Sequence, residues 1–193
     1  MEHTPFYPLP PLTLVLGGAR AGKSVYAERL ASGLAAGSTV PKPALYVATA
    51  EAGDMEMAAR ILAHRQRRGP SWTTVEVPLA VPEALREGAQ QGRAILLDCL
   101  TLWLSNLLHA GHDVDEAGDQ LLEAVHDLPC PVIMVANEVG LGIVPDNALA
   151  RRFRDDAGRL NMRVAAAADR VVLMSAGLPL LLKDRPVARE SGA

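Results

Sequence analysis

A short glycine-rich segment near the N-terminus has the spacing of a phosphate-binding loop. Residues 17–24 read GGARAGKS, so Gly17 is followed after four residues by Gly22, Lys23 and Ser24. Glycines let backbone N–H groups turn inward around phosphates, where a Cβ would obstruct the approach. Lys23 can then reach the outer phosphates, and the Ser24 hydroxyl can ligate Mg²⁺. We predict a nucleoside-triphosphate site here, the alternative being a glycine-rich turn without a ligand.

A carboxylate at the end of a later apolar run is a candidate second metal ligand. Asp98 ends the run AILLD. In nucleotide sites with a phosphate-binding loop, the aspartate that helps to hold Mg²⁺ commonly lies at the end of such a strand. Aspartate is also a favoured helix N-cap, and the helical pattern CLTLWLSNLL follows it directly. A metal-binding role, a capping role, or both together remain open for this residue.

The segment 54–78 carries a histidine among arginines. A helical reading places apolar residues on one face and a basic group on the other. The basic face contains Arg60, His64, Arg67 and Arg68. Neighbouring positive charges favour a neutral imidazole and attract phosphate, so a nucleophilic nitrogen of His64 could face a polyphosphate. The alternative is a solvated basic face with an incidental histidine.

Apolar runs of strand length alternate with helical patterns along the chain and would position these groups. The expected strands are residues 12–17, 44–49, 73–77, 94–98, 131–137 and 170–175. Such alternation is typical of an α/β fold with a mostly parallel sheet and helices on both faces. Ala176 and Gly177 separate the last of these runs from another apolar run, which predicts a C-terminal hairpin.

The longest predicted helix covers residues 147–169. Its apolar stripe consists of Leu149, Phe153, Ala157, Leu160, Val164 and Ala168. The opposite face is charged, and we expect a solvated surface with ion pairs between residues four apart. The expected pairs are Arg151 with Asp155, Arg152 with Asp156, and Asp155 with Arg159.

Length and composition favour one domain of ordinary size. The chain has 193 residues and a net charge of −3, without the basic footprint that nucleic-acid or anionic-membrane binding usually needs. We expect a proline-rich arm over residues 1–11, a catalytic domain over 12–183 and a polar tail over 184–193. Cys99 and Cys130 lie among apolar residues, which suggests buried thiols in a reducing compartment. The N-terminus does not resemble a signal peptide, and no run approaches 18 apolar residues, so we expect a cytoplasmic protein.

The residues alone argue against one class of nucleotide-binding protein and leave others open. A regulatory GTPase normally carries an N-K-x-D guanine-binding motif after a later strand, whereas residues 137–140 here read NEVG. Other guanine-binding motifs exist, and a nucleoside-monophosphate kinase also remains possible at this point.

Four blocks in order resemble the bifunctional adenosylcobinamide kinase / adenosylcobinamide-phosphate guanylyltransferase family. They are GGARAGKS, EMAARILAHRQRRGPSWTTVE, LLDCLTLWLSNLL and the segment from VANEVG to GLPLLLK, and the resemblance spans residues 12–183. It implies a P-loop NTPase-like domain with two reactions in cobalamin assembly. The first phosphorylates the hydroxyl of the aminopropanol arm of adenosylcobinamide with ATP or GTP. The second transfers GMP from GTP to that phosphate, giving adenosylcobinamide-GDP and pyrophosphate.

The resemblance also assigns roles to individual residues. In the family a histidine carries GMP as a phosphoramidate, and the matching residue is His64, with Ala63 where some members have a second histidine. Lys23 and Asp98 match catalytic positions, and Ser24 with Asp98 would hold Mg²⁺. The nucleotide-binding positions carried over are Gly17, Gly18, Ala19, Arg20, Ala21, Gly22, Lys23, Ser24, Ala48, Thr49, Ala50, Arg65, Gln66, Arg67, Arg68, Glu76 and Asp98. Ala21 departs from the serine usual in the family, although its backbone N–H is retained.

The family analogy further implies a homo-oligomer, with a trimer as the specific expectation, and no nucleic-acid partner. Two other hypotheses compete with it: a different P-loop small-molecule kinase and a non-catalytic GTP-binding switch. The first would leave the basic segment around His64 without a role. The sequence does not choose between ATP and GTP for the kinase step.

Overall fold

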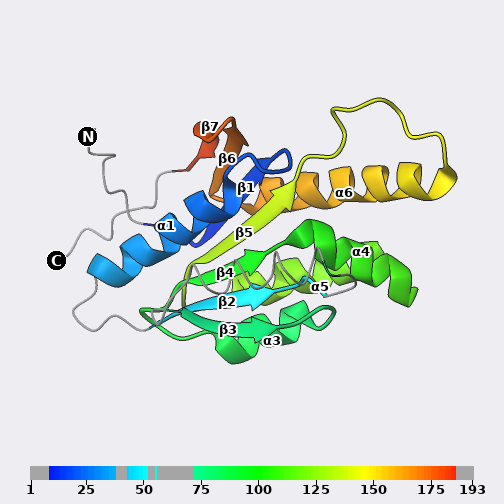
Figure 1. Cartoon of the computed structure of the whole chain (residues 1–193). Coiled ribbons are helices and arrows are strands. Elements are labelled where there is room, and N and C mark those ends of the chain that lie inside the picture. Colours follow the sequence, from blue (N-terminus) through cyan, green and yellow to red (C-terminus); the bar gives the residue numbers. More distant parts are fainter. Residues whose placement is uncertain (1–8, 38–42, 52–54, 56–71, 186–193) are drawn as a thin grey trace.

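The computed structural model describes residues 9–37, 43–51, 55 and 72–185, which contain one seven-stranded sheet. The strands follow the spatial order β3-β2-β4-β5-β1-β6-β7 (Figure 1). All neighbouring strands are parallel except β6 and β7, which form an antiparallel pair. Their bounds are β1 Leu12–Gly17, β2 Ala44–Ala48, β3 Trp72–Glu76, β4 Ile95–Asp98, β5 Val132–Asn137, β6 Arg170–Ser175 and β7 Leu178–Asp184.

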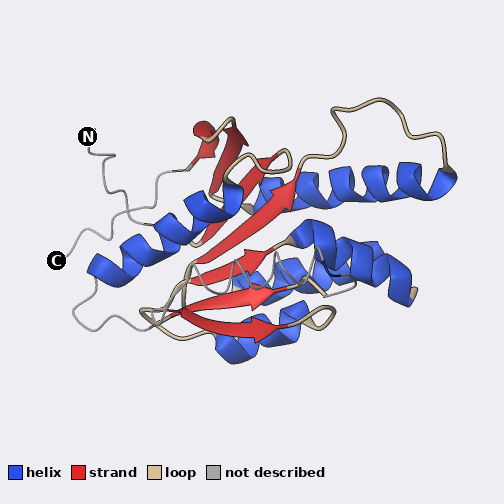
Figure 2. Ribbon diagram, in the orientation of Figure 1, coloured by secondary structure: helices blue, strands red, loops and turns tan. Residues whose placement is uncertain are grey.

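Helices cover both faces of this sheet (Figure 2). On one face α1 packs through Ala27 and Ala31, and on the other α3, α4, α5 and α6 bury their apolar side chains. Successive residues of one strand reach opposite faces, since Leu14 belongs to one core cluster and Val15 to the other. The helices are α1 Lys23–Gly37, α3 Val81–Gly88, α4 Leu100–Ala110, α5 Val114–His126 and α6 Ala148–Ala167.

The predicted α/β class, the six strands and the C-terminal hairpin are confirmed. Each strand begins and ends within one residue of its predicted bounds. Ala176 has φ 50° and Gly177 has φ 82°, so both central residues of the turn are left-handed. That backbone matches the right-handed twist of the two strands it connects.

Helix α6 confirms most of the predicted apolar stripe. Ala157, Leu160 and Val164 are buried, and Asn147 caps the helix by accepting a hydrogen bond from the N–H of Ala150 at 2.8 Å. Leu149 was predicted to be buried, and this is wrong because its side chain is 66% exposed. The first turns of α6 extend past the carboxyl ends of the strands, so the sheet offers no surface there (Figure 1).

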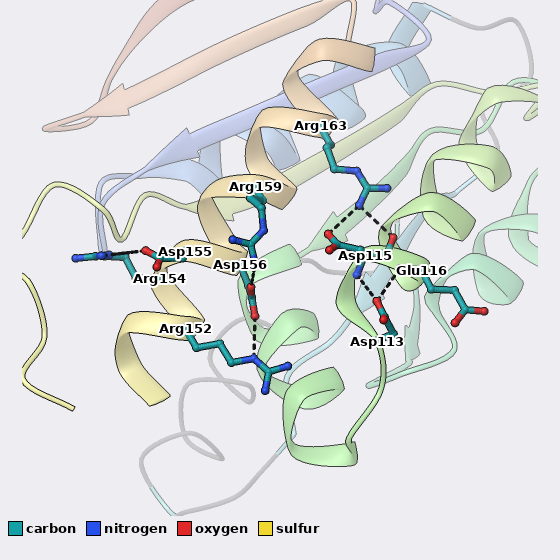
Figure 3. Close-up of polar contacts among 9 residues, drawn as sticks. All are labelled: Asp113, Asp115, Glu116, Arg152, Arg154, Asp155, Asp156, Arg159 and Arg163. Atoms are coloured by element: carbon teal, nitrogen blue, oxygen red, sulfur yellow. Dashed lines mark hydrogen bonds and ion pairs between the residues drawn. The ribbon is translucent and has the colours of Figure 1, made fainter. Parts of the chain in front are cut away.

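The prediction that the charged side chains of α6 are solvated is also wrong at one residue. Asp156 is only 5% exposed, and its carboxylate lies between Arg152 and Arg159 (Figure 3). The predicted pair with Arg152 is present, with 3.5 Å between Nε and Oδ2. Two guanidinium groups on one buried carboxylate compensate for its loss of hydration.

The other two predicted pairs of α6 are replaced by different contacts within the described residues. Arg151 instead donates to the carbonyl oxygens of Pro145 and Asp146, at 2.9 and 2.7 Å. Asp155 pairs with its neighbour Arg154 at 2.9 Å (Figure 3). Arg151 therefore holds the end of the β5–α6 connection against the helix.

Arg163 links α6 to the start of α5. Its guanidinium donates to the Asp115 carbonyl oxygen at 3.0 Å (Figure 3). It also pairs with the carboxylate of Asp119 on α5. Asp113 caps α5 by accepting from the N–H groups of Asp115 and Glu116, at 2.8 and 3.0 Å. These contacts join two helices that cover the same face of the sheet.

Candidate active site

The predicted phosphate-binding loop connects β1 to α1 at the carboxyl edge of the sheet. Gly17 has φ 151° and Gly22 has φ 95°, which confirms that the loop backbone needs glycine at both positions. A Cβ on Gly17 would lie 2.4 Å from the carbonyl oxygen of Met174, a backbone atom that cannot swing aside. Helix α1 begins at Lys23, so its free N–H groups point toward the loop.

Two neighbouring segments hold this loop. The N–H of Glu138, the residue after β5, donates to the Gly17 carbonyl oxygen at 3.1 Å. The N–H of Gly177, in the β6–β7 turn, donates to the Ala21 carbonyl oxygen at 3.2 Å. The C-terminal hairpin therefore supports the phosphate-binding loop as well as ending the sheet.

Lys23 lies inside the loop. Its Nζ donates to the Gly18 carbonyl oxygen at 2.6 Å, and the residue is only 7% exposed. Burial lowers the pKa of this ammonium group, while the negative charge of Asp98 opposes that effect. A phosphate oxygen entering the loop would offer the ammonium a stronger partner than a neutral carbonyl.

Asp98 ends β4 and does not cap the next helix. The N-cap of α4 is Cys99, which makes no side-chain capping hydrogen bond, so the capping alternative is wrong. The hydroxyl of Tyr46 instead donates to Oδ2 of Asp98 at 2.7 Å, and Oδ1 has no hydrogen bond within the described residues. This leaves one carboxylate oxygen available to a ligand.

Thr49 fixes the chain beside Asp98. Its buried hydroxyl accepts from the Cys99 N–H and donates to the Cys99 carbonyl oxygen, both at 2.8 Å. The Thr49 N–H also donates to the Asp98 carbonyl oxygen at 3.2 Å. Thr49 was carried over as a nucleotide-binding position, and its hydroxyl is already occupied by these backbone groups.

The other described residues that the family resemblance assigns to nucleotide binding lie along the carboxyl edge of the sheet. Ala48 is in register with Asp98 of β4 on one side and with Glu76 of β3 on the other. Ala50 lies two residues after Ala48 in the chain. Glu76 ends β3, four strand spacings or roughly 19 Å from β1. His64, Arg65, Gln66, Arg67 and Arg68 lie outside the described residues.

Two polar residues beside the loop were not identified from the sequence as site residues. Asn137 is the last residue of β5 and is in register with Gly17 of β1, and Glu138 follows it. The signal was the same one that identified Asp98, namely polar side chains directly after a buried strand. The segment NEVG lacks the guanine-binding motif, and that motif gives no indication of these two side chains.

The donor set at the loop fits a magnesium–nucleotide complex. Ser24 and Asp98 would supply a hydroxyl and a carboxylate oxygen, and Mg²⁺ prefers oxygen ligands. No group of three or more His, Cys, Asp or Glu side chains suited to a metal occurs among the residues that the structure describes. A nucleotide-bound Mg²⁺ needs no such cluster, because phosphate oxygens and waters complete its coordination.

No helix in the described ranges has the length and apolar character needed to cross a membrane.

The fold resembles solved structures at low sequence identity, and this likeness concerns the fold alone. The flagellar accessory protein FlaH from Methanocaldococcus jannaschii has a TM-score of 0.51 and 15% identity, covering 90% of this chain and 78% of FlaH. The KaiC-like protein PH0186 from Pyrococcus horikoshii has a TM-score of 0.53 and 14% identity, covering 93% and 81%. These likenesses confirm a P-loop NTPase fold.

Sequence relatives cover nearly the whole chain. The bifunctional adenosylcobalamin biosynthesis protein CobP of Pseudomonas aeruginosa is 49% identical over 178 residues, 90% of this chain and 98% of CobP. The bifunctional adenosylcobalamin biosynthesis protein CobU of Salmonella typhimurium is 41% identical over 187 residues, 89% of this chain and 99% of CobU. Residues 13–182 match the family described as cobinamide kinase / cobinamide phosphate guanyltransferase. A phosphate-binding loop with its lysine and nearby carboxylate, set in a chain matched over this range, shows that the protein belongs to that family.

Proposed function

We propose that this protein phosphorylates adenosylcobinamide with ATP or GTP and then transfers GMP from GTP to adenosylcobinamide phosphate. The products of the second reaction are adenosylcobinamide-GDP and pyrophosphate. The observation that carries the proposal is the match of residues 13–182 to a family named for both activities, in a chain whose phosphate-binding loop is complete. The relatives are likewise described as bifunctional proteins of adenosylcobalamin biosynthesis.

For the kinase step, the loop binds the triphosphate through the backbone N–H groups between Gly17 and Ser24. The Lys23 ammonium exchanges its bond with the Gly18 carbonyl oxygen for one with an outer phosphate oxygen. Ser24 and Asp98 would hold Mg²⁺, which neutralises phosphate charge when it is bound. Tyr46 keeps the Asp98 carboxylate in place through its hydroxyl.

For the transferase step, the proposed nucleophile is His64. Its ring nitrogen forms a bond to the α-phosphorus of GTP as the bond to the β-phosphate breaks, and pyrophosphate leaves with that electron pair. A phosphate oxygen of adenosylcobinamide phosphate then attacks the same phosphorus and releases the histidine. Covalent catalysis divides one displacement between two bulky anions into two easier steps. Family resemblance supports this assignment. The same resemblance supports nucleotide binding by Arg65, Gln66, Arg67 and Arg68.

Labelled nucleotides separate the proposal from its competitors. Enzyme, Mg²⁺ and adenosylcobinamide are incubated with γ-labelled ATP or GTP in one series and with α-labelled GTP in another. We expect γ-label in adenosylcobinamide phosphate and α-label in adenosylcobinamide-GDP. Transfer of γ-label alone would leave a P-loop small-molecule kinase, and binding without transfer would leave a GTP-binding switch. Running ATP and GTP in parallel also determines the phosphate donor.

We also propose that the chain acts as a cytoplasmic homo-oligomer, with a trimer as the expected state. The connection between β5 and α6 exposes large apolar side chains, with Leu141 88%, Ile143 96% and Val144 62% exposed. Exposed apolar side chains gathered in one short segment are typical of interfaces between proteins. Light scattering after size-exclusion chromatography tests this expectation, and a single species of 20.5 kDa would contradict it.

A further inference from the structure

An open pocket of about 540 Å³ lies next to the phosphate-binding loop and has no role in the steps above. Its walls are Leu16 at the end of β1, the turn from Glu138 to Gly140, and one face of α6. The α6 face includes Arg154, Gly158 and Met162, whose spacing of four places them on one side of the helix. The volume suits a small-molecule fragment, and the open mouth leaves room for a larger body outside.

The strand order places the strand that precedes this pocket's carboxylate, Glu138, directly beside β1. Among described residues, Glu51, Glu76, Asp98 and Glu138 follow or end strands at this edge. Strand β5, which precedes Glu138, is hydrogen-bonded directly to β1. Asp98 is two strand spacings from β1, and the remaining two carboxylates are three and four spacings away. Glu138 therefore follows the strand next to β1, and its backbone N–H contacts Gly17 at the start of the phosphate-binding loop.

The Glu138 side chain makes one hydrogen bond and keeps its other carboxylate oxygen free within the described residues. Its Oε1 accepts from the Gly140 N–H at 2.6 Å, and Oε2 has no hydrogen bond within the described residues. The backbone N–H of Glu138 donates a hydrogen bond to the Gly17 carbonyl oxygen, so Glu138 is directly attached to the phosphate-binding loop. A carboxylate oxygen in such a setting can accept a proton from a bound hydroxyl.

Two arginines add donors to the same pocket. Arg154 uses Nε and one terminal nitrogen on Asp155, and Arg159 uses one terminal nitrogen on Asp156 (Figure 3). Each guanidinium has five N–H donors, so both retain some for a ligand. The pocket thus combines an apolar wall, a proton acceptor and donors suited to a phosphoryl group.

We propose that this pocket binds the alcohol-bearing arm of the kinase substrate and that Glu138 is the general base of the phosphorylation. The inference rests on the proposed kinase function and assigns its acceptor site. The hydroxyl oxygen forms a bond to the γ-phosphorus while the bond from that phosphorus to the β–γ bridging oxygen breaks. The nucleoside diphosphate leaves with the electron pair, and the hydroxyl proton passes to Oε2 of Glu138. The bulk of the substrate remains outside the mouth.

The first test removes the base without removing its hydrogen bond. Glu138→Gln keeps an oxygen for the Gly140 N–H, so a purely structural role would be preserved. We expect kcat of the kinase step to fall by about 10²- to 10⁴-fold with the nucleotide KM unchanged. Protein-bound GMP formed from GTP alone should be unaffected, because that reaction uses no alcohol. The matched control is Glu123→Gln, which neutralises an exposed carboxylate on α5.

The second test fills the pocket. A Cβ built on Gly158 meets no atom within 4 Å, so Gly158→Leu should fold and place its side chain in the pocket. We expect the KM for adenosylcobinamide to rise at least tenfold, with nucleotide affinity and GMP adduct formation unchanged. Ala166→Leu adds the same side chain to an exposed position of α6 and should leave the KM as in the wild type.

The outcomes separate this inference from the proposed function. If the wild type transfers γ-label to adenosylcobinamide but Glu138→Gln keeps kcat within threefold, the general-base assignment is overturned. If Gly158→Leu binds nucleotide normally and keeps the wild-type KM for adenosylcobinamide, the acceptor site is overturned. If the wild type transfers no γ-label, the kinase function fails and this inference fails with it.

Discussion

Replacing Thr49 by valine tests whether its hydroxyl positions the segment that carries Asp98. Valine has nearly the same shape, so the change removes two hydrogen bonds without leaving a cavity. The Cys99 carbonyl oxygen keeps a partner, because the Trp103 N–H also donates to it at 3.1 Å. The buried Cys99 N–H loses its partner, which costs about 1–3 kcal/mol. For a chain of this length that lowers Tm by roughly 2–12 °C.

The matched control is Thr49→Ser, which keeps the hydroxyl and loses one buried methyl group at about 1 kcal/mol. Chemical denaturation measures the free energies of unfolding, and kinase turnover at saturating nucleotide reports on the position of Asp98. We expect the valine variant to be the less stable of the two and to lose more of its kcat. A valine variant as stable and active as the wild type, beside a weaker serine variant, would refute the reasoning.

Three further predictions concern the loop and the end of β4. Lys23→Ala should abolish both activities, because the ammonium contributes several kcal/mol to phosphoryl transfer; substantial kinase rate at saturating nucleotide would contradict this. Asp98→Asn keeps an acceptor for the Tyr46 hydroxyl, so Mg²⁺-dependent turnover should fall far more than Tm, and equal turnover would count against a metal role. Burial raises the pKa of the Cys99 thiol to about 12, so this thiol should react with a disulfide reagent at pH 8 only after unfolding. Rapid reaction of Cys99 in the native protein would show that the thiol is accessible.

Most strands could be predicted because they are apolar runs buried on both faces of the sheet, with helical patterns between the runs. Strand β3 is an exception, since it contains Thr73, Thr74 and Glu76 and lies largely exposed at the sheet edge. The order of the strands could not, because it depends on which edges pair across long stretches of chain. Strand β5 lies between β1 and β4, and this placement alone brings Glu138 to the loop. Asp98 also follows an apolar run, and it could be predicted because a metal-supporting acid commonly ends a strand in such nucleotide sites.

Contacts between distant residues limited the prediction of the site. The partner of the Thr49 hydroxyl is the backbone of Cys99, 50 residues later, and no local pattern indicates it. On α6, periodicity alone assigned Leu149 to the core and Asp156 to solvent, and both assignments were wrong. Helical spacing says which residues share a face, and the extent of the sheet beneath decides which of them are buried.

The central claim is that one nucleotide site serves two reactions and that His64 carries GMP between them. The most direct measurement incubates the enzyme with α-labelled GTP and Mg²⁺, isolates the denatured protein and maps the labelled peptide. We predict label on His64, labile in acid and fairly stable in base as a phosphoramidate should be. The His64→Ala variant should carry no label yet keep much of the kinase activity, which needs no histidine adduct. A His64→Ala variant that still transfers GMP at the wild-type rate would contradict the account.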